Sequence, residues 1–130
     1  MKPMLLLLLC LPGLATAASG AWQASATGPG LQNRGMQASS PGLAPAEKVN
    51  GSITEVAWRY VLNGPIPSGI RVHLCAETRC VPLDGASGTT RGLSNLMANQ
   101  SLYFVYGVEG KGRLNRELRV LSNQVMVNYH

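Results

Sequence analysis

Hydrophobic and polar residues alternate with a period of two along most of the second half of the chain. In SITEVAWRYVL, residues 52–62, the apolar positions that share one face are Val56, Trp58, Tyr60 and Leu62. The same alternation recurs over residues 70–75, 102–108, 114–122 and 123–130. Successive side chains of a β-strand point to opposite faces, so this period predicts strands with one face in a core.

Stretches rich in glycine, proline and asparagine separate these strands and predict turns. NGPIPSG at 63–69 ends the first long strand, EGKGR at 109–113 is typical of a hairpin turn, and a break at 122–123 divides the last two strands. Residues 93–100 are the one place where a helical turn is expected. Pro82 cannot donate to a sheet ladder, which predicts that its short strand lies at an edge or ends quickly.

The pattern predicts an all-β domain: a small β-sandwich, or a partly open barrel, of about six to eight short and mostly antiparallel strands. The predicted core consists of Trp58, Tyr60, Val72, Leu74, Leu102, Phe104, Tyr106, Val120, Val125 and Val127. Between a short strand at 21–27 and the strand at 52–62, glycine, proline and serine predominate. Residues 28–51 are therefore predicted to be a long irregular connection, with a brief strand near 31–37.

The chain opens with MKPMLLLLLCLPGLATAAS, in which Lys2 precedes an apolar run and then the small residues of 15–17. This order predicts a secretory signal peptide over residues 1–17, cleaved before Ala18. The run is shorter than the ~20 residues that a bilayer requires, and no later segment is apolar enough to span a membrane. We therefore expect a single β domain over residues 18–130, exported from the cytosol and not inserted in a membrane.

The net charge of +5 falls to +4 (5 − 1) when Lys2 leaves with the signal peptide. The charged residues are scattered singly along the sequence. Scattered charges are typical of solvated surfaces and not of a basic stripe that binds nucleic acid. No nucleic-acid partner is expected.

HLCAETRC, residues 73–80, holds one of the two histidines and two of the three cysteines. Cys10 leaves with the signal peptide, so an exported chain keeps Cys75 and Cys80 in an oxidising compartment, which favours a disulfide between them. A closed loop this short stabilises the fold by about 2 kcal/mol, enough to fix a hairpin. A zinc site that adds His73 to the two thiolates is the alternative, because His73 and Cys75 share a strand face, but oxidation removes its ligands.

The sequence contains no recognisable catalytic set. A hydrolase triad needs a base, and the only histidines are His73 and the last residue, His130. The only aspartate, Asp84, precedes a glycine in a predicted turn, and the glycine-rich 107–113 lacks the residue order and following helix of a phosphate-binding loop. We predict no catalytic residues, no metal and no cofactor, and hence a protein that acts by binding.

Two kinds of binding surface fit an exported β domain. The aromatic side chains of Trp22, Tyr103 and Tyr129 could face outward and contact a sugar or a protein, although packing within the sheets is the commoner fate of such residues. An unprotected sheet edge could instead bind an extended segment by strand addition. A periplasmic module that binds carbohydrate or peptidoglycan is therefore one candidate function.

Six further segments, taken in order, carry a resemblance to a known family. They are VAWRY (56–60), GPIPSGIRVHLC (64–75), RCVPL (79–83), SGTT (87–90), GRL (112–114) and NQVMVNY (123–129). Together with WQAS at 22–25 they resemble the flagellar protein FlhE family across essentially the whole predicted mature chain. Residues 28–51 and the AETR loop at 76–79 carry no motif that matches.

The resemblance implies a periplasmic, non-enzymatic accessory of flagellar biogenesis with no catalytic residues to assign. It implies a chaperone or guard that binds flagellar rod or hook subunits, or the export apparatus, and limits both proton leakage and misassembly, so that swarming motility is supported. The two cysteines fit a disulfide of the family.

We place the predicted partner surface on the hairpin that carries the two cysteines, because a disulfide would pre-organise that hairpin for docking. Its predicted contact residues are Arg71, His73 and Arg79, with Trp22 and Tyr103 as aromatic contacts. The alternative is that the Cys75–Cys80 bridge only protects a sheet edge.

Overall fold

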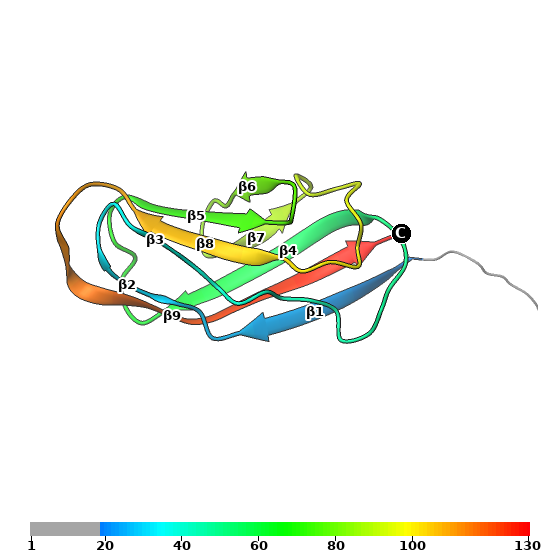
Figure 1. Cartoon of the computed structure of the whole chain (residues 1–130), viewed down its shortest axis with the longest axis horizontal. Helices are drawn as coiled ribbons and strands as arrows, with labels where there is room; N and C mark the ends of the chain where they lie inside the picture. The colour runs from blue at the N-terminus through cyan, green and yellow to red at the C-terminus, as the bar shows by residue number, and fades with distance from the viewer. Residues whose placement is uncertain (1–18) are drawn as a thin grey trace, which may run out of the picture.

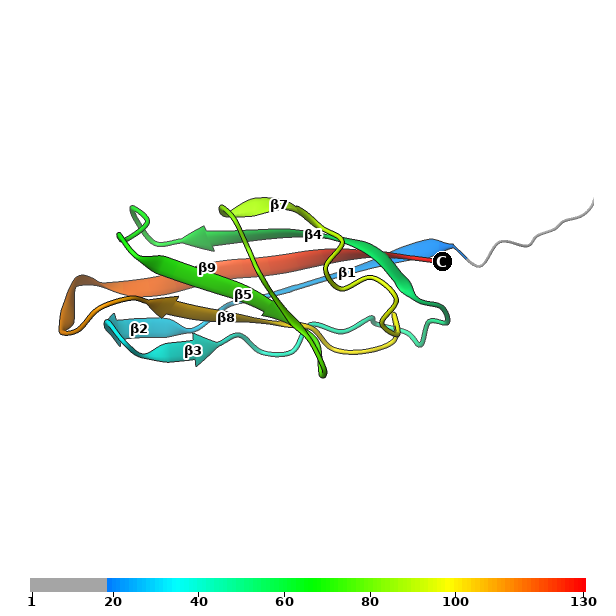
Figure 2. The same ribbon diagram turned by 90° about the horizontal axis from the view of Figure 1, so that it is seen from above.

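Two antiparallel β-sheets stack face to face in the computed structural model, which describes residues 19–130 (Figure 1, Figure 2). The predicted signal peptide at 1–17 lies outside these residues. One sheet has the order β1 (Gly20–Ala26), β9 (Arg113–Tyr129), β4 (Ile53–Leu62), β7 (Ser87–Thr90), with β2 (Gly30–Asn33) also paired to β9. The other has the order β3 (Gln37–Ser39), β8 (Tyr103–Val108), β5 (Ile70–Cys75), β6 (Cys80–Pro82). The predicted all-β sandwich is confirmed.

The core lies between the two sheets and contains all ten residues predicted for it. Three aromatic rings form its centre: Tyr60 meets Tyr106 edge-on at 5.5 Å between ring centroids, and Phe104 stacks on Tyr106 at 6.0 Å. The alternation with a period of two therefore correctly predicts these buried side chains. Pro82 also lies where predicted, because β6 is an edge strand.

The two closing strands predicted at 114–122 and 123–130 are instead one strand, β9, of 17 residues. Its buried positions change parity, from Leu118 and Val120 to Val125 and Val127. The pairing with β4 explains the change: Val61 is opposite Ser122 but Leu62 is opposite Val120, so Leu121 is an extra residue. A β-bulge of this kind shifts by one residue the positions whose side chains point inward, and the strand continues beyond it.

Three other expectations differ in detail from the structure of residues 19–130. The brief strand expected near 31–37 within the segment 28–51 is instead two short strands, β2 and β3, which raise the number of strands to nine. The predicted hairpin turn at 109–113 instead carries the chain from β8 in one sheet to β9 in the other. Residues 93–100 form turns and a bridge, without a helix. Nowhere in the described chain is there a helix able to cross a membrane.

The turns at 34–36 and 109–112 run side by side at one end of the sandwich (Figure 1). The amide of Arg34 donates to the carbonyl of Gly112 (2.7 Å), and that of Gly35 donates to the carbonyl of Val108 (2.8 Å). Gly35 has φ of +83°, and a Cβ there would lie 2.9 Å from the Gly110 carbonyl oxygen, so only glycine fits this crossing. At the opposite end, Gly20 pairs with Tyr129.

Candidate functional site

The hairpin of β5 and β6 brings Cys75 and Cys80 directly opposite each other. Their sulfur atoms lie 2.06 Å apart, at the distance of a disulfide. The tip of the hairpin is held by other contacts as well: Arg79 donates from Nη1 to the carbonyls of Gly92 and Ser94, both at 3.1 Å. Arg79 therefore anchors the tip to the loop at 91–100, and part of its hydrogen-bonding capacity is already used within the protein.

The other predicted contact residues of the hairpin are spread along it. Arg71 lies four residues from Cys75 along β5, roughly 13 Å in an extended strand, and its Nε forms an exposed salt bridge of 2.9 Å with Glu109. His73 is half-buried between Pro82 of β6 and Val105 of β8. Arg71 and His73 line one hollow, and Arg79 is not among its lining residues. The structure therefore does not gather the three side chains into one cluster.

Of the two predicted aromatic contacts, only one is near the surface. Tyr103 is half-buried and pairs with Cys75, beside the disulfide. Trp22 is only 8% exposed, and its indole N–H donates to the carbonyl of Ala98 at 2.9 Å. Trp22 is therefore not the surface contact that the sequence analysis predicts. Burial of a large aromatic ring on the inward face of β1 is more favourable than its exposure to water.

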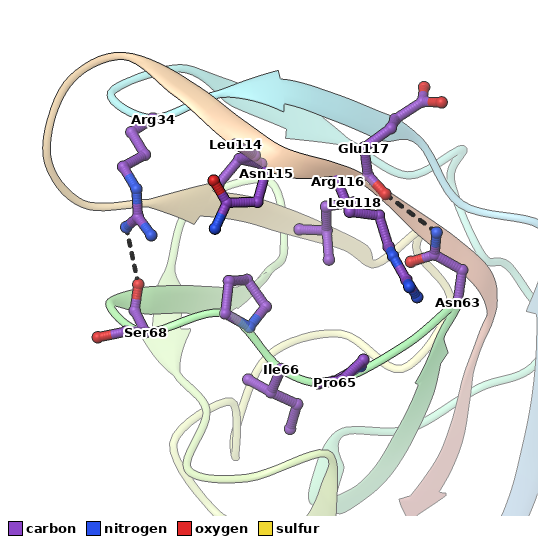
Figure 3. A pocket seen from close by; sticks show the side chains of 11 residues that line it. Arg34, Asn63, Pro65, Ile66, Ser68, Leu114, Asn115, Arg116, Glu117 and Leu118 are labelled. Atoms are coloured by element: carbon purple, nitrogen blue, oxygen red, sulfur yellow. Dashed lines mark hydrogen bonds between the residues drawn. The ribbon is translucent and has the colours of Figure 1, made fainter.

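A hollow in the surface lies at the end where the turns at 34–36 and 109–112 meet (Figure 3). We call it the basic groove and define it by Arg34, Asn63, Pro65–Ser68 and Leu114–Leu118. It has a volume of about 430 Å³, within the range of ligand sites in proteins. It forms because β9 continues beyond the end of β4, while the loop after β4 turns away toward β5.

The groove has an apolar lining between two arginines. Leu114 and Leu118 are buried on the β9 side, and Pro65 and the half-exposed Ile66 lie on the loop opposite them (Figure 3). Arg116 lies on the same face of β9 as Leu114 and Leu118, so its cationic group reaches into the groove instead of away from the sandwich (Figure 3). A side chain bound here would meet apolar surface and positive charge together.

Asn63 holds the two walls of the groove together. Its Nδ2 donates to the carbonyl of Glu117 (3.0 Å) and its Oδ1 accepts from the amide of Arg119 (3.1 Å). Its own amide donates to the Arg119 carbonyl (3.0 Å), so Asn63 completes the β4–β9 ladder where β4 ends. Across the groove, Nη1 of Arg34 donates to the carbonyls of Ser68 (2.9 Å) and Glu109 (3.0 Å). Hydrogen bonds from Asn63 and from Arg34 therefore hold the two sides of the groove in place.

The groove lies beside a segment that is rich in cations. Residues 111–119 carry the four cations Lys111, Arg113, Arg116 and Arg119 against one acid, Glu117. Arg34 lines the same groove as Arg116 and Glu117. We call this part of the sandwich, Arg34 together with residues 111–119, the basic end. The run at 111–119, with four cations and one acid, is the sequence signal that could have revealed the basic end.

The remaining polar chemistry of residues 19–130 is structural. Burial raises the pKa of Tyr106 far above its ordinary value, and the nearby Tyr60 raises it further. Its hydroxyl donates to Oδ1 of the fully buried Asn123 at 2.8 Å. Within residues 19–130, no three histidine, cysteine or acidic side chains lie together as metal ligands. The arrangement at the basic groove suits the binding of an anionic and partly apolar group.

Comparison with known proteins places these features in a family. The family model described as "Flagellar protein FlhE" matches residues 28–130. The chain is similar to the flagellar protein FlhE of Salmonella typhimurium, with 51% identity over 129 residues and 99% of each chain covered. For FlhE of Escherichia coli the identity is 48% over 126 residues, with 96% of this chain and 97% of the relative covered. A crystal structure of FlhE superposes with a TM-score of 0.86 at 54% identity, covering 88% of this chain and 99% of the other.

Proposed function

This chain belongs to the FlhE family of flagellar proteins, and from that premise we propose that it is a periplasmic, non-enzymatic accessory of flagellar biogenesis. In this proposal the signal peptide at 1–17 directs export, and the β-sandwich acts as a chaperone or guard. It holds flagellar rod or hook subunits, or components of the export gate, on the periplasmic side. By occupying them it limits misassembly and proton leakage, and in this way supports swarming motility.

The basic groove is the observation that carries the proposal of a holding function. An apolar hollow beside Arg34 and Arg116 can retain a short segment of another protein without any chemical step. Ile66 lines both this groove and the hollow that contains Arg71 and His73, so a longer partner segment could continue from one to the other. A positively charged docking end also speeds the encounter with negatively charged partners.

Capture of defined partners tests this function. The domain from residue 18, with its disulfide intact, is immobilised and exposed to periplasmic extract from flagellated cells, beside a known periplasmic chaperone and its clients. We expect rod, hook or export-gate proteins among the retained species. Recovery of none of them, under conditions in which the control chaperone retains its clients, would contradict the proposal.

The alternative of a carbohydrate- or peptidoglycan-binding module has less support. Such modules stack exposed aromatic rings on sugars, but Trp22 is buried and Tyr103 and Tyr129 are only partly exposed. Among residues 19–130 the large exposed apolar side chains are methionine, isoleucine and leucine, with no aromatic ring. Sedimentation with purified peptidoglycan decides between the two, since saturable binding that depends on Tyr103 would favour the module.

A further inference from the structure

Four consecutive residues of β9, Leu114 to Glu117, have no ladder partner in either neighbouring strand. On one side, Leu31 of β2 pairs with Leu118 and Asn33 pairs with Arg113. Only one residue of β2, Gln32, therefore lies opposite these four residues of β9. On the other side, the β4 ladder ends with Leu62 opposite Val120, and only Asn63 continues it. The register shift is a bulge in the β2–β9 pairing, and a bulge leaves its extra residues outside the ladder. The Glu117 carbonyl already accepts from Asn63 Nδ2, so Leu114 to Arg116 are the residues whose backbone can hydrogen-bond a bound segment.

The unpaired run coincides with the basic groove. Leu114 supplies part of its apolar lining, and Arg116 supplies its cationic group (Figure 3). Within residues 19–130, no carboxylate lies within 4.0 Å of the Arg116 guanidinium, whereas Arg71 and Arg119 each have an acidic partner. The groove therefore combines backbone outside the ladder, an apolar lining and an arginine without an acidic partner.

A glycine leaves room for this arginine. A Cβ added to Gly64 would lie only 2.5 Å from Nη1 of Arg116, so any larger residue at position 64 would displace the guanidinium. Gly64 does not have a positive φ, and the clash involves the far end of a flexible side chain. Alanine at position 64 should thus move the charge without straining the backbone.

We propose that the basic groove docks an extended peptide segment in which an acidic side chain stands next to an apolar one. The segment hydrogen-bonds to the backbone of Leu114 to Arg116, places its apolar side chain between Leu118 and Ile66, and directs its carboxylate to Arg116. This inference rests on the proposed function, in that such a segment would belong to an exported protein held before assembly. It goes further by naming the docking site and the chemistry of the bound segment.

The charge of the basic end selects this occupant over the others. A second copy of the chain, paired edge to edge, would bring Arg113 and Arg116 against the same residues of its partner, and like charges facing each other are unfavourable. An acidic segment from another protein is the occupant with complementary charge.

The test uses the domain from residue 18 and a synthetic heptapeptide that alternates valine and aspartate, blocked at both ends. A version with lysine in place of aspartate, and a version N-methylated at alternate residues, probe charge and backbone pairing separately. We expect saturable binding of the aspartate peptide alone. Protection from hydrogen exchange should appear at the amides of Leu114 to Arg116 and at few others.

Two variants and a matched control test the site. Arg116→Glu should weaken binding of the aspartate peptide at least about tenfold, because it replaces a charge-assisted contact with repulsion. Gly64→Ala should weaken it about threefold to tenfold with little loss of stability. Lys48→Glu makes the same charge change at an exposed position outside the groove and should leave the affinity within about twofold.

Several results would overturn the inference. These are absence of saturable binding, equal affinity for the lysine peptide, an Arg116→Glu variant that binds as well as Lys48→Glu, or concentration-dependent dimerisation that protects the amides of 114–116 without peptide. The proposed function fails separately: capture of rod or hook proteins that Arg116→Glu leaves unchanged refutes the groove alone. Peptide binding without any flagellar partner refutes the function alone.

Discussion

Removal of the Asn63 side chain is a sharp test of how the basic groove is held together. The substitution Asn63→Ala deletes the hydrogen bonds from Nδ2 to the Glu117 carbonyl (3.0 Å) and from the Arg119 amide to Oδ1 (3.1 Å). The backbone bond from the Asn63 amide to the Arg119 carbonyl should remain. The loop after β4 would then be tied to β9 by one hydrogen bond in place of three.

The expected cost follows from those two bonds. Each hydrogen bond contributes about 0.5–1.5 kcal/mol to the free energy of unfolding, so the loss of both costs about 1–3 kcal/mol. Because the site is partly exposed to water, we expect the lower part of this range, about 1–2 kcal/mol. For a domain of this size that loss lowers Tm by about 4–8 °C. Urea unfolding at neutral pH measures it, with an unchanged m-value expected because the rest of the fold is retained.

Hydrogen exchange localises the effect. The Arg119 amide, which loses its acceptor, should exchange faster in Asn63→Ala, while amides of the β1–β9 ladder keep their protection. Asn50→Ala is the control, since Asn50 is exposed and makes no side-chain hydrogen bond within residues 19–130. A loss below about 0.5 kcal/mol, or equal losses in the two variants, would refute the role of Asn63 as the clamp of the groove.

Three further predictions concern the core and the hairpin. Tyr106→Phe should destabilise the domain by about 1–3 kcal/mol in urea, because Oδ1 of the buried Asn123 loses its donor; a neutral result would show that water or another group replaces it. The pKa of Tyr106 is raised in the folded state, so its contribution to stability is fully present below pH of about 10 and is lost as the pH rises further; a pH series should show this loss in the wild type and less of it in Tyr106→Phe. Replacing Cys75 and Cys80 together by serine should cost about 2 kcal/mol yet leave peptide binding at the groove intact, and loss of that binding would place the docking surface on the hairpin instead.

The strands that could be predicted are those specified by their own local pattern. The alternation around Trp58 and Tyr60, and that around Val72 and Leu74, identify both the strands and the faces they bury. The same reasoning predicts two strands in place of β9. The extra residue Leu121 shifts the alternation of buried and exposed positions by one, and a local pattern does not distinguish such a bulge from the end of a strand.

Structure that depends on distant partners was not predictable in the same way. A brief strand near 31–37 could be predicted, but its division into β2 and β3 depends on β9 and β8, with which these two short strands pair. Trp22 could be recognised as part of a strand, but its burial depends on the loop that presents the Ala98 carbonyl. The run at 111–119 is a local signal for the basic end, but Arg34 joins it only when β2 has paired with β9.

Direct titration with purified flagellar subunits measures whether this FlhE-family domain holds them through its basic groove, as we propose. Unfolded rod and hook subunits are added to the domain from residue 18, and binding is followed by fluorescence anisotropy at two salt concentrations. We expect saturable binding to at least one subunit, weaker at high salt and weaker for Arg116→Glu than for Lys48→Glu. If no subunit binds at low salt with the disulfide intact, the domain does not hold flagellar subunits in this way.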